Sequence, residues 1–268
     1  MKSIFLFDMD GTLTPPRQKM PIDIEMMLKE IQEGGSEIGI ITGSDMEYIT
    51  QQCSGLFDLS LVNSNRIHFF PCNGTKYILD DKKIYSKDMR DYMGENAWHK
   101  LITFLIKKQY DIVSKLGVTI PLTGHFFDYR ESMLNWCPIG RNANNKDRAV
   151  WSFVDEGNFI RTPMLQEVQD YIKNDIRHIA DLATGDIQIE VKYGGDTSFD
   201  IFPKGWDKTF PLEKKNLFHD YKIFFIGDRC QENGNDYEIF NHPLTTAFET
   251  HSTEQTIEIV NKILSSDV

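Results

Sequence analysis

Two aspartates and a glycine close to the N-terminus have the residue types and the spacing for nucleophilic and acid–base chemistry. The segment DMDGTLT occupies residues 8–14 and directly follows an apolar run over residues 4–7, which is typical of a strand buried on both faces. Doubly wound folds bind ligands at the carboxyl ends of their parallel strands, so we expect Asp8 and Asp10 to lie near one crevice. Gly11 allows the chain to turn sharply between them.

Two carboxylates at this spacing repel each other unless a cation lies between them or they share a proton. A hard divalent cation with oxygen ligands, Mg²⁺, would relieve the repulsion and would also bind a phosphate. One carboxylate could then attack phosphorus as a nucleophile, while the other acts as a general acid or base. The plainer interpretation is an acidic turn after a strand.

A second group of acidic residues follows a second buried strand, predicted over residues 222–226. Gly227-Asp228 comes directly after this strand, and Asn235-Asp236 comes shortly after that. If the two strands are neighbours in a sheet, Asp228 lies within reach of the cation that Asp8 binds. A Gly/Asn/Asp turn over residues 233–235 is the alternative for that segment alone.

The elements that position these groups alternate between strand and helix. A helix is expected to begin at Pro21 and to end at Gly34-Gly35, because its apolar residues recur at helical spacing (Ile24, Met27, Leu28 and Ile31). A second buried strand over residues 38–41 is followed by a helix that begins at Ser44 or Asp45. Strand and helix alternating in this way predict a right-handed parallel unit.

The middle of the chain differs from its two ends. Long helices over residues 96–108 and 163–181 are expected among short strands such as 125–129 and 187–191, whereas a capping box over residues 252–255 starts a last helix. The predicted fold is therefore α/β, with a Rossmann-like core that contains a parallel sheet and an inserted α+β cap domain. We expect the core over residues 1–81 and 207–268, and the cap over residues 82–206.

The composition is that of a globular protein and argues against several classes. The chain has 268 residues, of which 40% are hydrophobic and 26% charged, so it is not intrinsically disordered. The net charge of −11 disfavours a nucleic-acid groove, since clustered cations bind phosphate backbones. No apolar run approaches about 18 residues, so we expect no membrane association. Four cysteines without a CxxC pair favour reduced thiols and a cytoplasmic location.

Several segments together carry a resemblance to a known family. The segments are DMDGTLT with Arg17, Gly43-Ser44-Asp45, Arg130, Met133-Leu134-Asn135, Pro138-Ile139-Gly140-Arg141, SFDIFPKGWDK at 198–208 and NDYEIF at 235–240. The first segment with Gly227-Asp228 is similar to the haloacid-dehalogenase (HAD) phosphotransferase superfamily. Along nearly its whole length the chain resembles the eukaryotic-type phosphomannomutases.

In the core, the resemblance implies a role for each matching residue. Asp8 is the expected phosphoryl-accepting nucleophile, and Asp10 the acid/base that serves the sugar hydroxyl. Asp8, the backbone of Asp10 and Asp228 are expected to bind Mg²⁺. The remaining core roles are hydrogen bonding to the transferring phosphoryl group (Ser44, with Thr42 as the alternative), charge neutralisation (Lys208) and substrate binding (Arg17).

In the cap, the resemblance implies that Arg130 and Arg141 bind the phosphate that is not reacting. Ser198 and Asp200 are expected to bind sugar hydroxyls or phosphate. A planar guanidinium is the best bidentate partner for phosphate, which supports the two arginine assignments.

The chain departs from the family pattern at four positions. Thr123 stands where the family usually has a cap arginine, and His242 where it has an aspartate thought to help bind a second cation. Cys72 replaces an acidic residue, and Thr42 replaces a glycine. The first change puts cap affinity in question; Lys115 or Arg148 could substitute for the missing charge.

The resemblance implies a Mg²⁺-dependent phosphomannomutase that interconverts mannose 6-phosphate and mannose 1-phosphate for GDP-mannose synthesis and glycosylation. Hexose 1,6-bisphosphate would be its intermediate and activator, glucose phosphates further candidate substrates, and a homodimer joined through the caps its assembly. One alternative is a sugar-phosphate phosphatase on the same fold, in which water takes the phosphoryl group from Asp8. The other is a non-catalytic sugar-phosphate-binding relative, which intact Asp8, Asp10, Lys208 and Asp228 argue against.

Overall fold

The computed structural model describes residues 2–57, 62–63, 66–115, 117, 119–179, 186–213, 215–232 and 234–266. The chain divides into two compact units, Met1–Ser86 with Gly205–Val268 and Lys87–Lys204, which are called the core and the cap below. The boundaries expected from the sequence, after residues 81 and 206, lie a few residues from these divisions.

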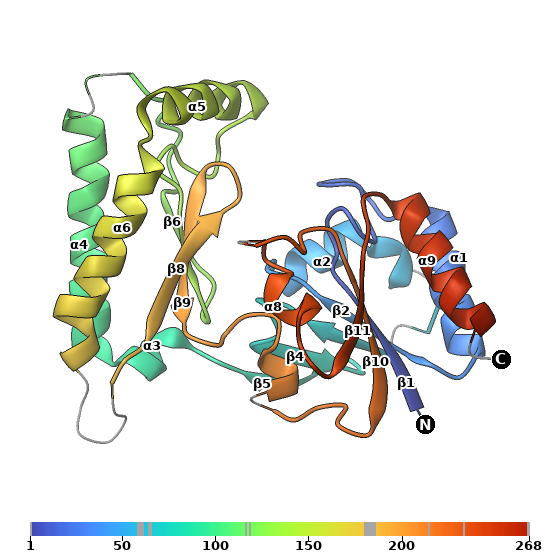
Figure 1. The fold of residues 1–268 in the computed structure, drawn as a ribbon. Coiled ribbons are helices and arrows are strands. Elements are labelled where there is room, and N and C mark those ends of the chain that lie inside the picture. The colour runs from blue at the N-terminus through green and yellow to red at the C-terminus, as the bar shows by residue number, and fades with distance from the viewer. Residues whose placement is uncertain are drawn as a thin grey trace. The chain divides into compact units, whose positions relative to one another are not determined.

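Among the described residues, the core forms a seven-stranded sheet in the order β11-β10-β1-β2-β3-β4-β5 (Figure 1). Its strands are β1 (Lys2–Phe7), β2 (Glu37–Ile41), β3 (Ile67–Phe70), β4 (Lys76–Leu79), β5 (Lys82–Ser86), β10 (Tyr221–Gly227) and β11 (Thr245–Glu249). The strands from β11 to β3 pair in parallel, and β4 and β5 add an antiparallel edge. The carboxyl ends of β10, β1 and β2 therefore lie side by side, which brings the two predicted acidic segments together.

The strand side chains alternate between two apolar layers, as the continuous run over residues 4–7 predicted. Phe5 and Phe7 belong to one cluster, with the buried faces of α1 (Ile22–Glu33) and α9 (Thr253–Ser266). Ile4 and Leu6 belong to a second cluster on the other face, with residues of α7 (Phe210–Glu213) and α8 (Tyr237–Phe240). Burial on both faces fixes the strand register and hence the position of Asp8.

Of two helix starts in the core, one has the expected cap and the other forms only half of the predicted capping box. Asp45 caps α2 (Met46–Gln52), where its Oδ1 accepts a hydrogen bond from the backbone N–H of Tyr48 at 2.9 Å. Ser252 Oγ accepts from the N–H of Gln255 at 3.2 Å at the start of α9, but the Gln255 side chain accepts from the N–H of His251 instead of closing the box on Ser252. A short 3-10 helix, η1 (Ser54–Leu56), follows α2.

The cap contains a four-stranded antiparallel sheet, counted over its described residues, in the order β6-β7-β9-β8. The strands are β6 (Phe127–Tyr129), β7 (Leu134–Trp136), β8 (Ile189–Gly194) and β9 (Ser198–Pro203). The helical elements are α3 (Met89–Met93), α4 (Glu95–Lys115), α5 (Asn145–Asn158), α6 (Arg161–Tyr171), η3 (Ile172–Ile176) and η4 (Arg177–Ile179). In Figure 1, α4 and α6 run alongside one face of this sheet. Buried contacts such as Trp136 Nε1–H to Gln109 Oε1, 2.8 Å, join β7 to α4.

The predicted fold class, a Rossmann-like core with a parallel sheet and an inserted α+β cap, is confirmed. The helix expected over 163–181 is instead α6 followed by a π-helical and a 3-10 segment, and its last two residues lie outside the described residues. The strand expected over 125–129 begins at Phe127, because His125 has φ +54° and cannot continue an extended strand. In the described part of the chain no helix combines the length and apolarity needed to cross a membrane.

Candidate active site

A buried lysine joins two buried carboxylates at the end of β1. The backbone N–H of Asp8 donates to the carbonyl of Ile226 in β10 at 2.9 Å, which fixes Asp8 beside that strand. Lys208 is fully buried, and its Nζ donates to Asp8 Oδ1 and, at 2.5 Å, to Asp236 Oδ1. Asp236 is also fully buried, and its Oδ2 accepts from the backbone N–H of Arg229 at 3.1 Å.

Two glycines allow the carboxylates to approach the backbone. Gly11 has φ +89°, and a Cβ placed on it would lie 2.4 Å from Asp228 Oδ2. A Cβ on Gly227 would lie 2.6 Å from Asp236 Oδ2. Any side chain at either position would displace a carboxylate, so the glycines are required by the packing of the acidic groups.

One carboxylate oxygen from each of Asp8, Asp228 and Asp236 lies within 4.8 Å of the others. The three negative charges exceed the single positive charge of Lys208. Burial raises the pKa of Asp8 and of Asp228, although Lys208 opposes the rise at Asp8. Burial by itself lowers the pKa of Lys208, but Asp236 and Asp8 raise it above its ordinary value. A cluster of hard oxygen ligands with excess negative charge fits a divalent cation such as Mg²⁺.

Asp10 has an environment unlike that of Asp8. Its Oδ1 accepts hydrogen bonds from the hydroxyl of Tyr48 at 3.1 Å and from the backbone N–H of Arg17 at 3.2 Å. Arg17 is exposed and has φ +60°, a conformation that turns its N–H towards Asp10. Burial, followed by the charge of Asp10, raises the pKa of Tyr48, so the phenol stays a donor at neutral pH.

The turn after β2 is held by the segment after β3. The backbone N–H groups of Cys72 and Asn73 donate to the carbonyls of Ser44 and Thr42, each at 2.8 Å. Thr42 is buried, and its hydroxyl accepts from the backbone N–H of Ser44 at 3.2 Å. The turn therefore uses the Thr42 hydroxyl internally and leaves Ser44, which is half-buried, as the better candidate for a phosphoryl contact.

In the cap, polar side chains form one row across three strands. Asp128 pairs with Asn135, and Asn135 pairs with Asp200, so their side chains share one face of the sheet. Leu134 and Trp136, which flank Asn135, point to the opposite, helix-covered face. Asn135 Nδ2 donates to Asp200 Oδ1 at 2.6 Å.

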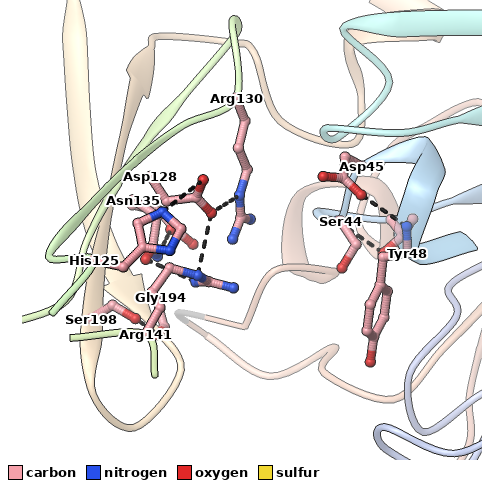
Figure 2. Close-up of polar contacts among 12 residues, drawn as sticks. Ser44, Asp45, Tyr48, His125, Asp128, Arg130, Asn135, Arg141, Gly194 and Ser198 are labelled. Atoms are coloured by element: carbon pink, nitrogen blue, oxygen red, sulfur yellow. Dashed lines mark hydrogen bonds and ion pairs between the residues drawn. The ribbon is translucent and has the colours of Figure 1, made fainter. Parts of the chain in front are cut away.

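Two arginines lie over this row (Figure 2). Arg130 Nε lies 2.9 Å from Asp128 Oδ2, and Arg141 Nε lies 3.3 Å from the same oxygen. Arg141 Nη1 also donates to Asn135 Oδ1 at 2.9 Å. Burial and, after it, the charge of Arg130 lower the pKa of Arg141. Two neighbouring guanidiniums that destabilise each other's charge are a favourable site for an anion such as phosphate.

Thr123 stands where the family usually has a cap arginine, and Arg148 and Lys115 are the two cations that could replace its charge. The hydroxyl of Thr123 donates to the carbonyl of Ile139 at 2.9 Å, and a Cβ on Gly140 would lie 2.1 Å from the carbonyl oxygen of Gly124. Arg148 donates to the carbonyl of Ala143 and to the hydroxyl of Thr197, at 3.1 and 3.0 Å. Lys115 pairs with Asp111 at 2.7 Å, on α4.

In the core, the structure brings Asp8, Lys208 and Asp228 together in one group. In the cap, it brings Arg130, Arg141 and Asp200 together in another group. Ser198 is buried, and its hydroxyl donates to the carbonyl of Gly194 at 2.8 Å. Sequence patterns assigned no role to four side chains that make contacts in these sites: Asp236, Tyr48, Asp128 and Asn135. Asp236 belongs to the second acidic segment, and Asn135 belongs to a segment that resembles the family. Neither pattern indicates which residue the side chain contacts.

Beside His242, which stands where the family has an aspartate, the hydroxyl of Thr245 makes a bifurcated hydrogen bond to the carbonyls of Ile239 and His242, at 2.7 and 2.9 Å. The His242 ring lies 3.6 Å from Glu213. The carbonyls of Ile239 and His242 therefore already accept a hydrogen bond from the Thr245 hydroxyl.

Comparisons with known proteins show which family the chain resembles. A sequence model described as eukaryotic phosphomannomutase matches residues 24–266. The chain is 31% identical over 263 residues to the phosphomannomutase of Drosophila melanogaster, covering 97% of this chain and 95% of that protein. It is 31% identical over 255 residues to the phosphomannomutase of Arabidopsis thaliana, covering 95% and 93%.

A solved structure of a haloacid dehalogenase-like hydrolase from Bacteroides thetaiotaomicron shares the fold, with a TM-score of 0.59 and 14% identity, covering 98% of this chain and all of that one. A likeness at this identity concerns the fold alone. The family match over most of the chain and the two relatives go further: the chain belongs to the eukaryotic phosphomannomutase family.

Proposed function

We propose that this protein is a phosphomannomutase that interconverts mannose 6-phosphate and mannose 1-phosphate through an aspartyl-phosphate and a hexose 1,6-bisphosphate. The observation that carries the proposal is the buried Asp8–Lys208–Asp236 arrangement beside Asp228, in a chain of this family. Phosphoryl transfer needs positioning and charge neutralisation more than covalent assistance, and these groups supply both.

Asp8 is the nucleophile in this proposal. Lys208 neutralises charge on Asp8 and on the incoming phosphoryl group, and Asp236 holds the lysine in place. Asp8, Asp228 and the backbone of Asp10 would bind Mg²⁺, with Asp236 as a further carboxylate of the cluster. When bound, the cation would balance the phosphoryl charge that Lys208 alone does not. The Ser44 hydroxyl would donate to the phosphoryl group.

Asp10 is the acid/base. As Asp8 forms its bond to phosphorus, the bond from phosphorus to the sugar oxygen breaks and that oxygen takes the proton of the Asp10 carboxyl group. In the second half-reaction a sugar hydroxyl gives its proton to the Asp10 carboxylate while its oxygen attacks the phosphorus on Asp8. The Asp8 carboxylate is then released and Asp10 is protonated again.

The cap supplies the phosphate contacts. Arg130 and Arg141 would bind the phosphate that is not reacting, while Asp200 and Ser198 contact sugar hydroxyls or phosphate. Arg17 would contact substrate from the core. The support is the pair of guanidiniums on one oxygen of Asp128 and their link through Asn135 to Asp200.

A sugar-phosphate phosphatase is the second candidate, and Thr123 is the observation that favours it. Its hydroxyl is directed to the carbonyl of Ile139, and no guanidinium comes from that position. A cap that binds the remote phosphate weakly would release the bisphosphate more easily and admit water to the aspartyl-phosphate.

We propose further that the enzyme works in the cytoplasm, supplies mannose 1-phosphate for GDP-mannose and glycosylation, and accepts glucose phosphates as further substrates. We also propose a homodimer joined through the caps. Exposed apolar residues at helical spacing on α4 support that surface (Ile106, Tyr110 and Val113). Sedimentation of the wild-type chain would give the mass of a dimer, whereas a monomer at micromolar concentration would contradict it.

The experiment that tests the function measures two products in one assay. The protein is supplied with mannose 1-phosphate, a catalytic amount of hexose 1,6-bisphosphate and Mg²⁺, and mannose 6-phosphate and free phosphate are followed together. A mutase gives more isomerised sugar than phosphate. Phosphate release without isomerisation indicates the phosphatase, and binding without either product indicates a non-catalytic relative.

A further inference from the structure

Tyr48 joins the first turn of α2 to the acid/base of the proposed reaction. Its backbone N–H donates to the side chain of Asp45, the N-terminal capping residue of α2, and its half-buried ring packs against the apolar cluster of the core that contains Phe5 and Phe7. From this fixed position its hydroxyl donates to Asp10 Oδ1 at 3.1 Å. Figure 2 shows Tyr48 beside Asp45 at the start of the helix.

Both hydrogen bonds to the Asp10 side chain fall on the same oxygen. The backbone N–H of Arg17 donates to Oδ1 at 3.2 Å, and the Tyr48 hydroxyl donates to it from another element. Across the residues that the structure describes, Oδ2 receives no such bond. A carboxyl group held in this way has its Oδ1 as acceptor in either protonation state, and Oδ2 is the atom left to exchange a proton with a sugar oxygen.

We propose that Tyr48 is a positioning residue that fixes the orientation of the Asp10 carboxyl group for proton transfer to and from the sugar hydroxyl. The proposal rests on the proposed function, in which Asp10 gives a proton to the sugar oxygen as the phosphorus–oxygen bond breaks and takes one back in the second half-reaction. An acid/base must lie within hydrogen-bond reach of the reacting oxygen, so a carboxyl group that can rotate spends less time in the productive geometry.

The test compares four enzymes: wild type, Tyr48→Phe, Asp10→Asn and the double variant. Phenylalanine keeps the packed ring and removes the hydroxyl alone. Loss of a hydrogen bond to a charged group predicts a kcat for isomerisation of mannose 1-phosphate that is about 10- to 100-fold lower, with KM within about twofold of wild type. In the Asp10→Asn background the same substitution should change kcat by less than about twofold, because Tyr48 acts through Asp10.

Tyr221→Phe is the matched control. The hydroxyl of Tyr221 also donates to a carboxylate, Glu37 Oε1 at 2.8 Å, in the same unit but at the opposite ends of the strands. It should leave kcat and KM unchanged, which separates loss of positioning from loss of any tyrosine–carboxylate bond.

Three outcomes would overturn the assignment. The first is a Tyr48→Phe enzyme with wild-type kcat, and the second is an equal loss in the wild-type and Asp10→Asn backgrounds, which would mean that Tyr48 acts elsewhere. The third is a wild-type protein that does not isomerise mannose phosphates, which removes the proposed function and the role of Tyr48 with it. An active wild type with an unaffected Tyr48→Phe variant overturns the role alone.

Discussion

Replacing Lys208 with methionine tests the electrostatics of the core most severely. The lysine is fully buried between Asp8 and Asp236, which are themselves 3% and 0% exposed. Methionine fills a similar volume and is apolar, so the substitution removes the charge with little change in packing. Two buried carboxylates then lose their common counter-charge.

The structure allows the size of the effect to be worked out. One unit-charge pair at the 2.5 Å separation of Lys208 and Asp236 has an attraction of about 7 kcal/mol at an effective dielectric constant of about 20. Desolvation of both ions offsets much of this attraction, and removal of one partner of a buried pair typically costs about 3–5 kcal/mol. For a domain of this size, that loss corresponds to a melting temperature roughly 6–20 °C lower.

The assay is thermal unfolding in the presence of a chelator, so that no bound cation replaces the missing charge. Lys29→Met is the control: its partner Glu33 lies 3.6 Å away on the surface of α1, and we expect a loss below about 1 kcal/mol. The double variant Lys208→Met with Asp236→Asn should melt above Lys208→Met alone, because one of the two unpaired charges is gone. A single variant as stable as wild type, or a double variant no better than the single one, would refute this account.

Three further predictions concern catalysis and pH. Asp10→Asn should lower kcat for isomerisation by roughly 10²–10⁴-fold while bisphosphate binding survives; near-normal turnover at neutral pH would exclude Asp10 as the acid/base. Arg141→Ala should weaken hexose-phosphate binding and raise the phosphate released per isomerisation, and Thr123→Arg should lower that ratio; unchanged values would remove the cap contacts from the mechanism. Burial lowers the pKa of His68 despite its contact with Glu37, so the unfolded chain takes up a proton more readily. Wild-type stability should therefore fall more steeply than that of His68→Gln as the pH drops below about 6.5, and parallel urea-denaturation profiles would contradict this.

Sequence periodicity predicted the elements with the strongest burial. The run over residues 4–7 and the helical spacing of Ile24, Met27, Leu28 and Ile31 correspond to β1 and to the buried face of α1. Helix α5 was not predicted, since among its residues only Trp151 and Asp155 are buried and most of its surface is polar. Its signal was the capping box of Asn144 with Asp147, which a search for apolar spacing does not detect.

From strand order alone, the site was predictable where a residue follows its own strand and not where a contact joins distant segments; the roles of Lys208, Arg130 and Arg141 came from the family resemblance. Asp8 and Asp228 were expected together if the strands that precede them were neighbours, and β1 and β10 do pair in parallel. The role of Asp236 depends on Lys208, which lies 28 residues before it in the sequence, and that of Tyr48 on Asp10, 38 residues before it. No local pattern encodes such pairs, because the rotamers and the packing of whole elements decide them.

If Asp8 accepts the phosphoryl group, the phosphoenzyme can be trapped and the modified residue identified. The enzyme is mixed with hexose 1,6-bisphosphate and Mg²⁺, quenched in acid within milliseconds to seconds, digested and mapped by mass spectrometry. We expect one phosphorylated peptide with the modification on Asp8, and none in an Asp8→Asn variant that is folded and does not isomerise mannose 1-phosphate. A modification on any other residue, or isomerisation by Asp8→Asn, would contradict it.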